Sequence, residues 1–165
     1  MEPNSQLHPT AQKVADAAGD LGLEIAIREF EETTRTAEDA ARAVGCNVAQ
    51  IVKSLLFLVN GQPTMALVSG PNRLDEKKLA ALCRVGRKKI RRANADIVRE
   101  VTGFAIGGVP PFGHKTSLTV YIDEDFWRFE TIWAAAGTPN AVFSLSPGEL
   151  VRTTQGLVGD LKVNI

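Results

Sequence analysis

Residues 47–70, NVAQIVKSLLFLVNGQPTMALVSG, form the stretch that most limits how this chain can fold. Read as a strand, residues 51–59 present mostly apolar side chains on both faces, because side chains alternate with period two. A strand of this kind is covered on both sides. Asn60-Gly61 is a typical hairpin turn between this strand and a second apolar one. Lys53 is then the only full charge in a dry stretch, so it needs a partner or a shifted pKa.

The rest of the chain alternates between helical and extended patterns. Helices are expected from Pro9 to near Gly22 and over 36–45, 74–83, 94–103 and 146–156, with a short helical turn over 124–129. Further strands are expected over 23–31, 117–123, 131–136 and 141–146. Because strands are paired at least once and helices are interspersed, we predict an α+β fold with a mixed, largely antiparallel sheet. No linker or repeat divides residues 1–165, so we expect one domain.

The composition excludes several classes of function. The formal net charge of the 165 residues is zero, so nucleic acid can be contacted only through a local patch. Cys46 and Cys83 are too few for a disulfide framework, and His8 and His114 lie far apart, so neither a metal nor a cofactor is expected. The first residues form no apolar or basic leader, and no run reaches transmembrane length. We therefore expect a cytoplasmic protein without a membrane partner.

The segment GFAIGGVPPFGHKTS, residues 103–117, has the most unusual local chemistry. The glycines Gly107 and Gly108 let the backbone approach another group closely, and Pro110 and Pro111 fix the backbone that follows. Exposed amides of such a loop can bind a carbonyl, a phosphate or a carboxylate. The alternative is a connection that only turns a corner. His114 is read as a hydrogen-bonding histidine rather than a catalytic base.

A basic run, RVGRKKIRRA, covers residues 84–93. Arg87, Lys88 and Arg91 form either a solvated surface or a patch that contacts phosphates, since arginine and lysine provide most backbone contacts to nucleic acid. The lack of aromatic residues within the run argues against a platform for stacked bases. Standard nucleotide-binding loops and the motifs of serine or zinc hydrolases are absent from the sequence.

Four segments in this order resemble the YbaK/prolyl-tRNA-synthetase-associated domain family. They are QIVKSLLFLVNG, ALVSGPNRLDEKKLAAL, GFAIGGVPPFGH and IDEDFWRFETIWAAAGTPN, and the resemblance extends from about Thr10 to the final helix. Members are compact mixed domains with a curved, partly barrel-like sheet. They hydrolyse the ester of wrongly charged aminoacyl-tRNA, either within prolyl-tRNA synthetase or as free-standing proteins. This chain is similar to a free-standing member.

The resemblance also implies roles for individual residues. Lys53 matches the strand lysine that is essential for deacylation, and the GGVPP segment from Gly107 to Pro111 matches the loop whose backbone holds the substrate. The positions implied for the aminoacyl pocket are Phe30, Ser54, Pro110, Pro111, His114, Ala135 and Gly137. Some members have Ser or His near Ala135, where this chain has only alanines. The amino-acid preference of those members therefore does not transfer directly.

This resemblance suggests why a lysine sits in an apolar strand. Lys53 would point into a pocket, where a cation in a low dielectric stabilises the negative charge that develops on the ester. Water and the substrate's own ribose hydroxyl would complete the reaction. The expected partner is mischarged aminoacyl-tRNA, with Ala or Cys on proline tRNA as the first guess. A synthetase that acts together with this protein in trans is a second possible partner. DNA is not expected as a partner. A non-catalytic tRNA-binding module and a small-molecule binding protein are the competing hypotheses.

Overall fold

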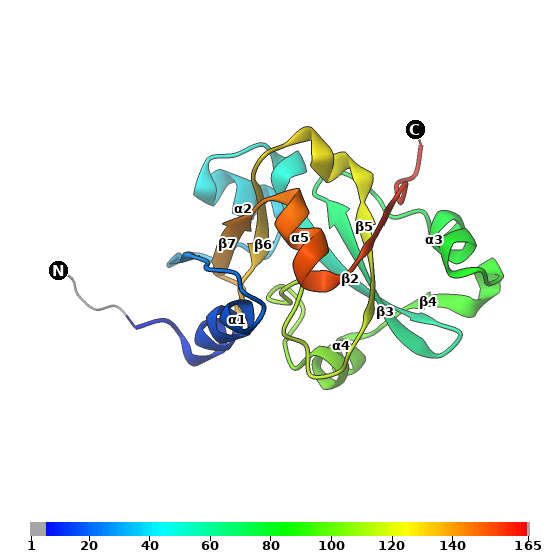
Figure 1. Ribbon diagram of the computed structural model, residues 1–165, viewed down its shortest axis with the longest axis horizontal. Helices are drawn as coiled ribbons and strands as arrows, with labels where there is room; N and C mark the ends of the chain where they lie inside the picture. The colour runs from blue at the N-terminus through cyan, green and yellow to red at the C-terminus, as the bar shows by residue number, and fades with distance from the viewer. Residues whose placement is uncertain (1–5, 165) are drawn as a thin grey trace.

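A long hairpin lies at the centre of the fold (Figure 1). In the computed structural model, which describes residues 6–164, β2 (Val52–Val59) pairs with β3 (Gln62–Ser69) along its whole length. Asn60 and Gly61 both have positive φ, 52° and 81°, as a tight two-residue turn between antiparallel strands requires. The predicted hairpin is confirmed.

Two sheets are built around this hairpin. The larger has the order β4-β2-β3-β5-β8, where β4 spans Ile90–Arg92, β5 spans Thr119–Asp123 and β8 spans Leu157–Gly159. β5 runs parallel to both β3 and β8, whereas β2 pairs antiparallel with β3 and β4. The smaller, antiparallel sheet has the order β1 (Ile27–Glu29), β7 (Ala141–Leu145), β6 (Ile132–Ala135). A single bridge between Ile51 and Trp133 joins the two sheets, which do not close into a barrel.

Within residues 6–164, five α-helices surround the sheets (Figure 1). They are α1 (Pro9–Asp20), α2 (Ala37–Val44), α3 (Glu76–Cys83), α4 (Ala95–Thr102) and α5 (Pro147–Thr154). Short 3-10 turns cover η1 (Val48–Gln50), η2 (Arg87–Lys89) and η3 (Glu124–Arg128). The α+β class and the mixed, largely antiparallel sheet are therefore as predicted.

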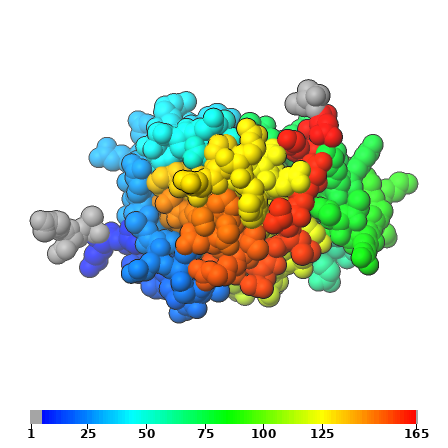
Figure 2. Space-filling model, turned by 45° about the horizontal axis from the view of Figure 1, so that its top comes forward, coloured from blue at the N-terminus to red at the C-terminus, as the bar shows by residue number. Residues whose placement is uncertain are grey.

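The helices begin where their capping residues predict. The Thr36 hydroxyl accepts a hydrogen bond from the Asp39 amide at the start of α2, and Gly45 ends that helix in the left-handed region. At α5, Ser146 and Glu149 form a reciprocal capping box, and Pro147 occupies the first helical position. Figure 2 shows α5 and β7 (orange) between the N-terminal part (blue) and the C-terminal strand (red).

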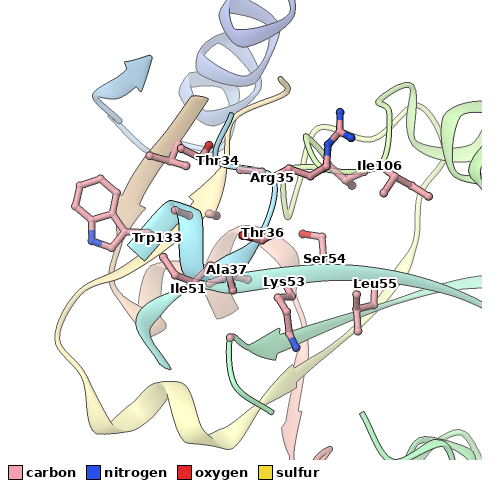
Figure 3. A pocket seen from close by; sticks show the side chains of 18 of the residues that line it. Thr34, Arg35, Thr36, Ala37, Ile51, Lys53, Ser54, Leu55, Ile106 and Trp133 are labelled. Atoms are coloured by element: carbon pink, nitrogen blue, oxygen red, sulfur yellow. The ribbon is translucent and has the colours of Figure 1, made fainter. Parts of the chain in front are cut away.

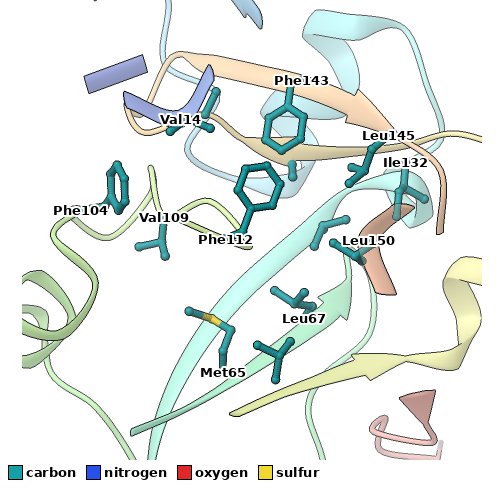
Figure 4. Close-up of a cluster of buried hydrophobic side chains, with 14 of the residues drawn as sticks. Val14, Met65, Leu67, Phe104, Val109, Phe112, Ile132, Phe143, Leu145 and Leu150 are labelled. Atoms are coloured by element: carbon teal, nitrogen blue, oxygen red, sulfur yellow. The ribbon is translucent and has the colours of Figure 1, made fainter. Parts of the chain in front are cut away.

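The main core lies between the two sheets (Figure 4). Met65 and Leu67 from β3 face Phe143 and Leu145 from β7 across this space. Phe112 inserts between them, and its ring centroid lies 5.6 Å from that of Phe143. The glycine- and proline-rich segment is thus anchored in the core by its own apolar side chain.

A second core covers the other face of the hairpin. Phe57 and Val59 of β2 pack there with Leu79 and Ala80 of α3 and with Leu161 near the C-terminal end. The prediction that β2 is covered on both faces is confirmed. Burial of this kind is favourable by roughly 25 cal/mol per Å² of apolar surface, so both faces contribute to holding β2 in place.

Three strands differ from the sequence-based expectations: β4, β8 and β1. β4 and β8 were not predicted, because three-residue strands carry too few positions to show an alternating pattern. The strand expected over 23–31 shortens to Ile27–Glu29, since only these residues have partners in β7.

Within residues 6–164, none of the helices has the length and apolar character needed to cross a membrane.

Candidate active site

The middle of β2 has an open edge, where its backbone groups lack a strand partner. β4 pairs with β2 only from Phe57 to Val59, and β6 reaches β2 only through the bridge between Ile51 and Trp133. Between these two contacts, residues 53–55 have no strand partner on that side. The Leu56 carbonyl accepts from the Ala93 amide at 3.0 Å, so the backbone groups of residue 54, two positions earlier, face the same open edge.

A cavity of about 420 Å³ occupies this gap. Its walls come from β2, the start of α2, the 106–109 loop, and strands β6 and β7 (Figure 3). The lining residues are Thr34, Arg35, Thr36, Ala37, Glu38, Ala40, Ile51, Val52, Lys53, Ser54, Leu55, Gly70, Arg92, Ile106, Gly107, Val109, Trp133, Ala134, Ala135 and Val142. Four of the residues proposed from the sequence, Lys53, Ser54, Gly107 and Ala135, therefore line one cavity.

Lys53 is half-buried at the border of this cavity. Its Nζ donates a hydrogen bond of 2.6 Å to the carbonyl of Asn72, in the loop between β3 and α3. Burial lowers the pKa of Lys53, while the negative charges of Glu38 and Asp123 act in the opposite direction. An ammonium has three donors, so two remain for a substrate.

Asn72 is itself fixed by two carboxylates. Its side-chain Nδ2 lies 2.8 Å from Asp123 Oδ2 and 2.8 Å from Asp125 Oδ2. Asp123 is 1% exposed and also accepts from the Ser69 amide, and Asp125 pairs with Lys162 at 2.9 Å. The carbonyl that holds Lys53 is thus tied to the end of β5, a rigid part of the larger sheet.

Ser54 points to the opposite side of β2 from Lys53, toward Thr36 and Arg35 (Figure 3). Its Oγ is buried and has no hydrogen-bond partner among the described residues. A buried hydroxyl without a partner is uncommon, because it carries its full desolvation penalty. A ligand with a donor or acceptor at this position would satisfy it.

Gly107 and Gly108 lie in the same turn but have different surroundings. Gly107 has a φ of 96°, lines the cavity and lies under Arg35, whose Cγ would be 2.9 Å from an added Cβ. Gly108 instead packs against β6 and the turn that follows it: its carbonyl accepts from the Gly137 amide at 2.9 Å, and an added Cβ would lie 2.7 Å from the Gly137 oxygen. Gly107 thus faces the cavity, whereas Gly108 makes an internal contact.

The remaining positions proposed from the sequence lie outside the cavity lining. Pro110 and Pro111 are buried, and the Pro110 carbonyl accepts from His114 Nε2 at 2.7 Å. Burial lowers the pKa of His114, although this hydrogen bond opposes the shift. Gly137 packs against the first turn of α1.

Phe30 also lies outside the cavity lining. It stacks with Arg28, whose guanidinium carbon is 5.2 Å from the ring centroid. The Arg28 guanidinium carbon also lies 5.7 Å from the Trp133 ring centroid, and Trp133 does line the cavity. Phe30 is therefore connected to the cavity wall only indirectly, by way of Arg28 and Trp133.

The basic run lies at the edge of the larger sheet, in η2 and β4. Arg87, Lys88 and Arg91 are exposed, and Arg87 Nη2 pairs with Glu76 Oε1 at 2.6 Å. Arg92 was part of the run but was not proposed as a site residue, and it lines the cavity. The run therefore leads from the surface directly to the site.

Sequence reasoning also missed Arg35, Thr36 and Trp133 as cavity residues. Thr36 was recognised only as a helix cap, and Arg35 precedes it in a segment without periodicity. Of these three residues, only Trp133 left a signal in the sequence, because it is a large side chain in the strand expected over 131–136, which also contains Ala135. Within residues 6–164, no group of His, Cys, Asp or Glu side chains could hold a metal ion.

Several known proteins are similar to this chain. Residues 31–153 match the model of the aminoacyl-tRNA editing domain. The uncharacterized protein YwhH of Bacillus subtilis (strain 168) is 36% identical over 125 residues, which cover 75% of this chain and 78% of YwhH. The proline–tRNA ligase of Maridesulfovibrio salexigens is 34% identical over 127 residues, but these cover only 21% of that enzyme.

Solved structures show the same relationship. A crystal structure described as "a putative trans-editing enzyme for prolyl tRNA synthetase" has a TM-score of 0.91 and 46% identity, with 96% of this chain and 100% of that chain covered. Another, of hypothetical protein APE2540, has a TM-score of 0.84 and 30% identity, covering 92% of this chain and 99% of that one. The chain belongs to the aminoacyl-tRNA editing domain family.

Proposed function

We propose that this protein, as a single domain of residues 1–165, is a trans-acting deacylase. It hydrolyses the ester between a wrong amino acid and its tRNA, with alanine or cysteine on proline tRNA as the first candidates. The observation that carries the proposal is that Lys53 and Gly107 line the same cavity in a chain of the editing-domain family. The similarity to a whole chain described as a trans-editing enzyme for prolyl tRNA synthetase supports action in trans.

The proposed reaction is a direct attack of water on the ester carbonyl. The carbonyl oxygen becomes an oxyanion in the tetrahedral intermediate, and the Lys53 ammonium is the nearby charge that stabilises it. The bond to the ribose oxygen then breaks, the ribose oxygen takes a proton, and free amino acid and tRNA leave. Partial burial of Lys53 strengthens this effect, because charges interact more strongly away from water.

The turn at Gly107 would supply a second contact to the ester. The Gly108 amide donates to the Ala105 carbonyl at 3.0 Å and closes the turn, with Gly107 at its third position. A positive φ there is typical of this kind of turn and is easily adopted only by glycine. The Gly107 amide makes no hydrogen bond within the described part of the chain, so it can donate to the substrate.

The choice of amino acid would depend on the apolar end of the cavity. Ala134, Ala135 and Val142 form a wall of small side chains there. Such a wall discriminates by size, and one methylene group changes binding by about 1–3 kcal/mol. The Ser54 hydroxyl, which lacks a partner among residues 6–164, would accept a hydrogen bond from the amino group of the substrate.

The test is a panel of labelled alanyl-, cysteinyl- and seryl-tRNA, each on proline tRNA, together with correctly charged prolyl-tRNA. We expect hydrolysis of at least one mischarged species at a rate that depends on protein concentration, and no hydrolysis of the prolyl species. Binding of all four without hydrolysis would favour a tRNA-binding module, and no binding at all would favour a small-molecule binding protein.

A further inference from the structure

A second cavity, of about 540 Å³, adjoins the first. Its walls come from Lys53, Leu55 and Phe57 on β2 and from the segment 71–74 that leads into α3. Lys53, Leu55 and Arg92 line both cavities, so the two spaces meet at the lysine. The second cavity lies on the side toward which the Lys53 side chain points in Figure 3. Its volume is in the range of about 300–1,000 Å³ that is usual for ligand sites.

The two cavities carry similar charges but differ in their apolar walls. The first is lined by three cations, Arg35, Lys53 and Arg92, and by one acid, Glu38. The second is lined by three cations, Lys53, Arg73 and Arg92, and by one acid, Glu76, which pairs with Arg87. Within residues 6–164, neither Arg73 nor Arg92 takes part in an ion pair, and both are exposed. Arg73 therefore gives the second cavity a cation that can hold an anion, whereas only the first cavity has the wall of alanines and valine that suits a small side chain.

Arg92 has an orientation that suits a nucleobase. Its guanidinium carbon lies 5.6 Å from the ring centroid of Phe57, which is 2% exposed, so the guanidinium rests on a fixed ring. Arg92 is also exposed, so its side chain is accessible to a ligand. Unpaired RNA bases stack on arginine planes of this kind.

We propose that this second cavity binds the nucleotide that precedes the esterified one at the 3′ end of the RNA. Arg73 contacts the phosphate between the two nucleotides, and Arg92 stacks on the base. This assignment rests on the proposed function: with the amino acid in the first cavity and the ester at Lys53, the RNA must leave through an adjoining space that accepts negative charge. The exposed basic run then continues the same path, since Arg92 is its last basic residue.

The test uses two ligands that carry no amino acid, adenosine and the dinucleotide cytidylyl-adenosine, whose binding is measured by NMR titration. We expect the wild-type protein to bind the dinucleotide about tenfold more tightly than adenosine, as expected for a hydrogen bond to a charged group. Arg73→Ser should reduce this preference to the part contributed by stacking on Arg92, without changing the affinity for adenosine. Arg99→Ser is the matched control, because Arg99 is an exposed arginine on α4 that lines neither cavity, and it should retain the preference.

Salt dependence gives a second readout. Salt screens the attraction between Arg73 and the phosphate, so binding of the dinucleotide should weaken as the salt concentration rises. Arg73→Ser should therefore make dinucleotide binding less dependent on salt, and Arg99→Ser should not change this dependence. Equal affinity of the wild type for both ligands, or an undiminished preference in Arg73→Ser, would overturn the proposal. Neither readout involves hydrolysis, so a failed deacylation assay and a failed nucleotide site are separate results.

Discussion

At the scale of single residues, Lys53 has a chemical environment that other lysines of the chain lack. Burial lowers its pKa, whereas a hydrogen bond and the charge of Asp125 raise the pKa of the more exposed Lys162. We expect side-chain NMR of labelled lysines to show Lys53 losing its proton at a lower pH than Lys162. If the ammonium form is the active one, deacylation falls as pH rises through the Lys53 pKa. Titration of Lys53 at or above the pH of Lys162 would contradict this picture of the site.

Gly107 and Gly108 allow a second residue-level prediction. Gly107→Val should lower kcat/KM about 10²–10³-fold for every mischarged tRNA that is accepted, which is the usual loss when one oxyanion donor is removed. Both variants should lower the melting temperature, because the Gly108→Ala Cβ would meet the Gly137 backbone and valine does not easily adopt the φ of 96° at position 107, but only Gly107→Val should change the contact to the ester. The measurements are kcat/KM on alanyl-, cysteinyl- and seryl-tRNA and thermal unfolding of both variants.

Ala135 provides the matched contrast for Gly107. A larger residue such as valine at position 135 narrows the apolar wall, so it should change the order of preference among the three amino acids. Full activity of Gly107→Val on all three substrates would show that the turn is only a connector.

At the scale of structural elements, the loop between β3 and α3 positions Lys53. Asn72→Ala removes both hydrogen bonds to Asp123 and Asp125 and frees the carbonyl that holds Nζ. We expect a lower kcat with little change in KM, because the substrate still binds while the lysine is less well placed.

A suitable control for this variant is Asn94→Ala. It removes the cap of α4, where Asn94 Oδ1 accepts from the Ile97 amide at 2.9 Å, at a cost of about 0.5–2 kcal/mol. We expect Asn94→Ala to lose about as much stability as Asn72→Ala, but without a change in the hydrogen bond of Lys53. Equal kcat values for the two variants would mean that Asn72 affects only the fold.

The edge formed by η2 and β4 carries the next prediction. Replacing Arg87, Lys88 and Arg91 by Ser should raise KM for tRNA and flatten its salt dependence, while single-turnover rates at saturation stay the same. Lys13→Ser on α1 serves as a control, since this exposed lysine lies outside the run. An unchanged salt slope in the triple variant would indicate that this edge faces away from the RNA.

At the scale of the whole molecule, the sequence predicted the features that depend on local pattern. The hairpin, the capped helices and the α+β class follow from alternation, turn residues and caps, which act over a few positions. The site was predictable only in part. Lys53 was identifiable because a charge interrupts an apolar strand, and Gly107 because glycines and prolines cluster around it.

Other parts of the site depend on contacts between distant segments. Asn72 holds Lys53 only because Asp123, 51 residues later, lies beneath it. Arg92 enters both cavities because β4 ends where the open edge of β2 begins. Neither relationship leaves a periodic or compositional mark, so neither could be predicted from one sequence.

The most direct test compares the wild type with Lys53→Ala on whichever mischarged tRNA the wild type hydrolyses best. Single-turnover deacylation and thermal unfolding are measured on the same preparations, with Lys162→Ala as a control that removes another lysine bonded near the loop. We predict that Lys53→Ala folds normally but shows no hydrolysis above the rate without protein, while Lys162→Ala remains active. Turnover near the wild-type rate by a folded Lys53→Ala protein would contradict the account.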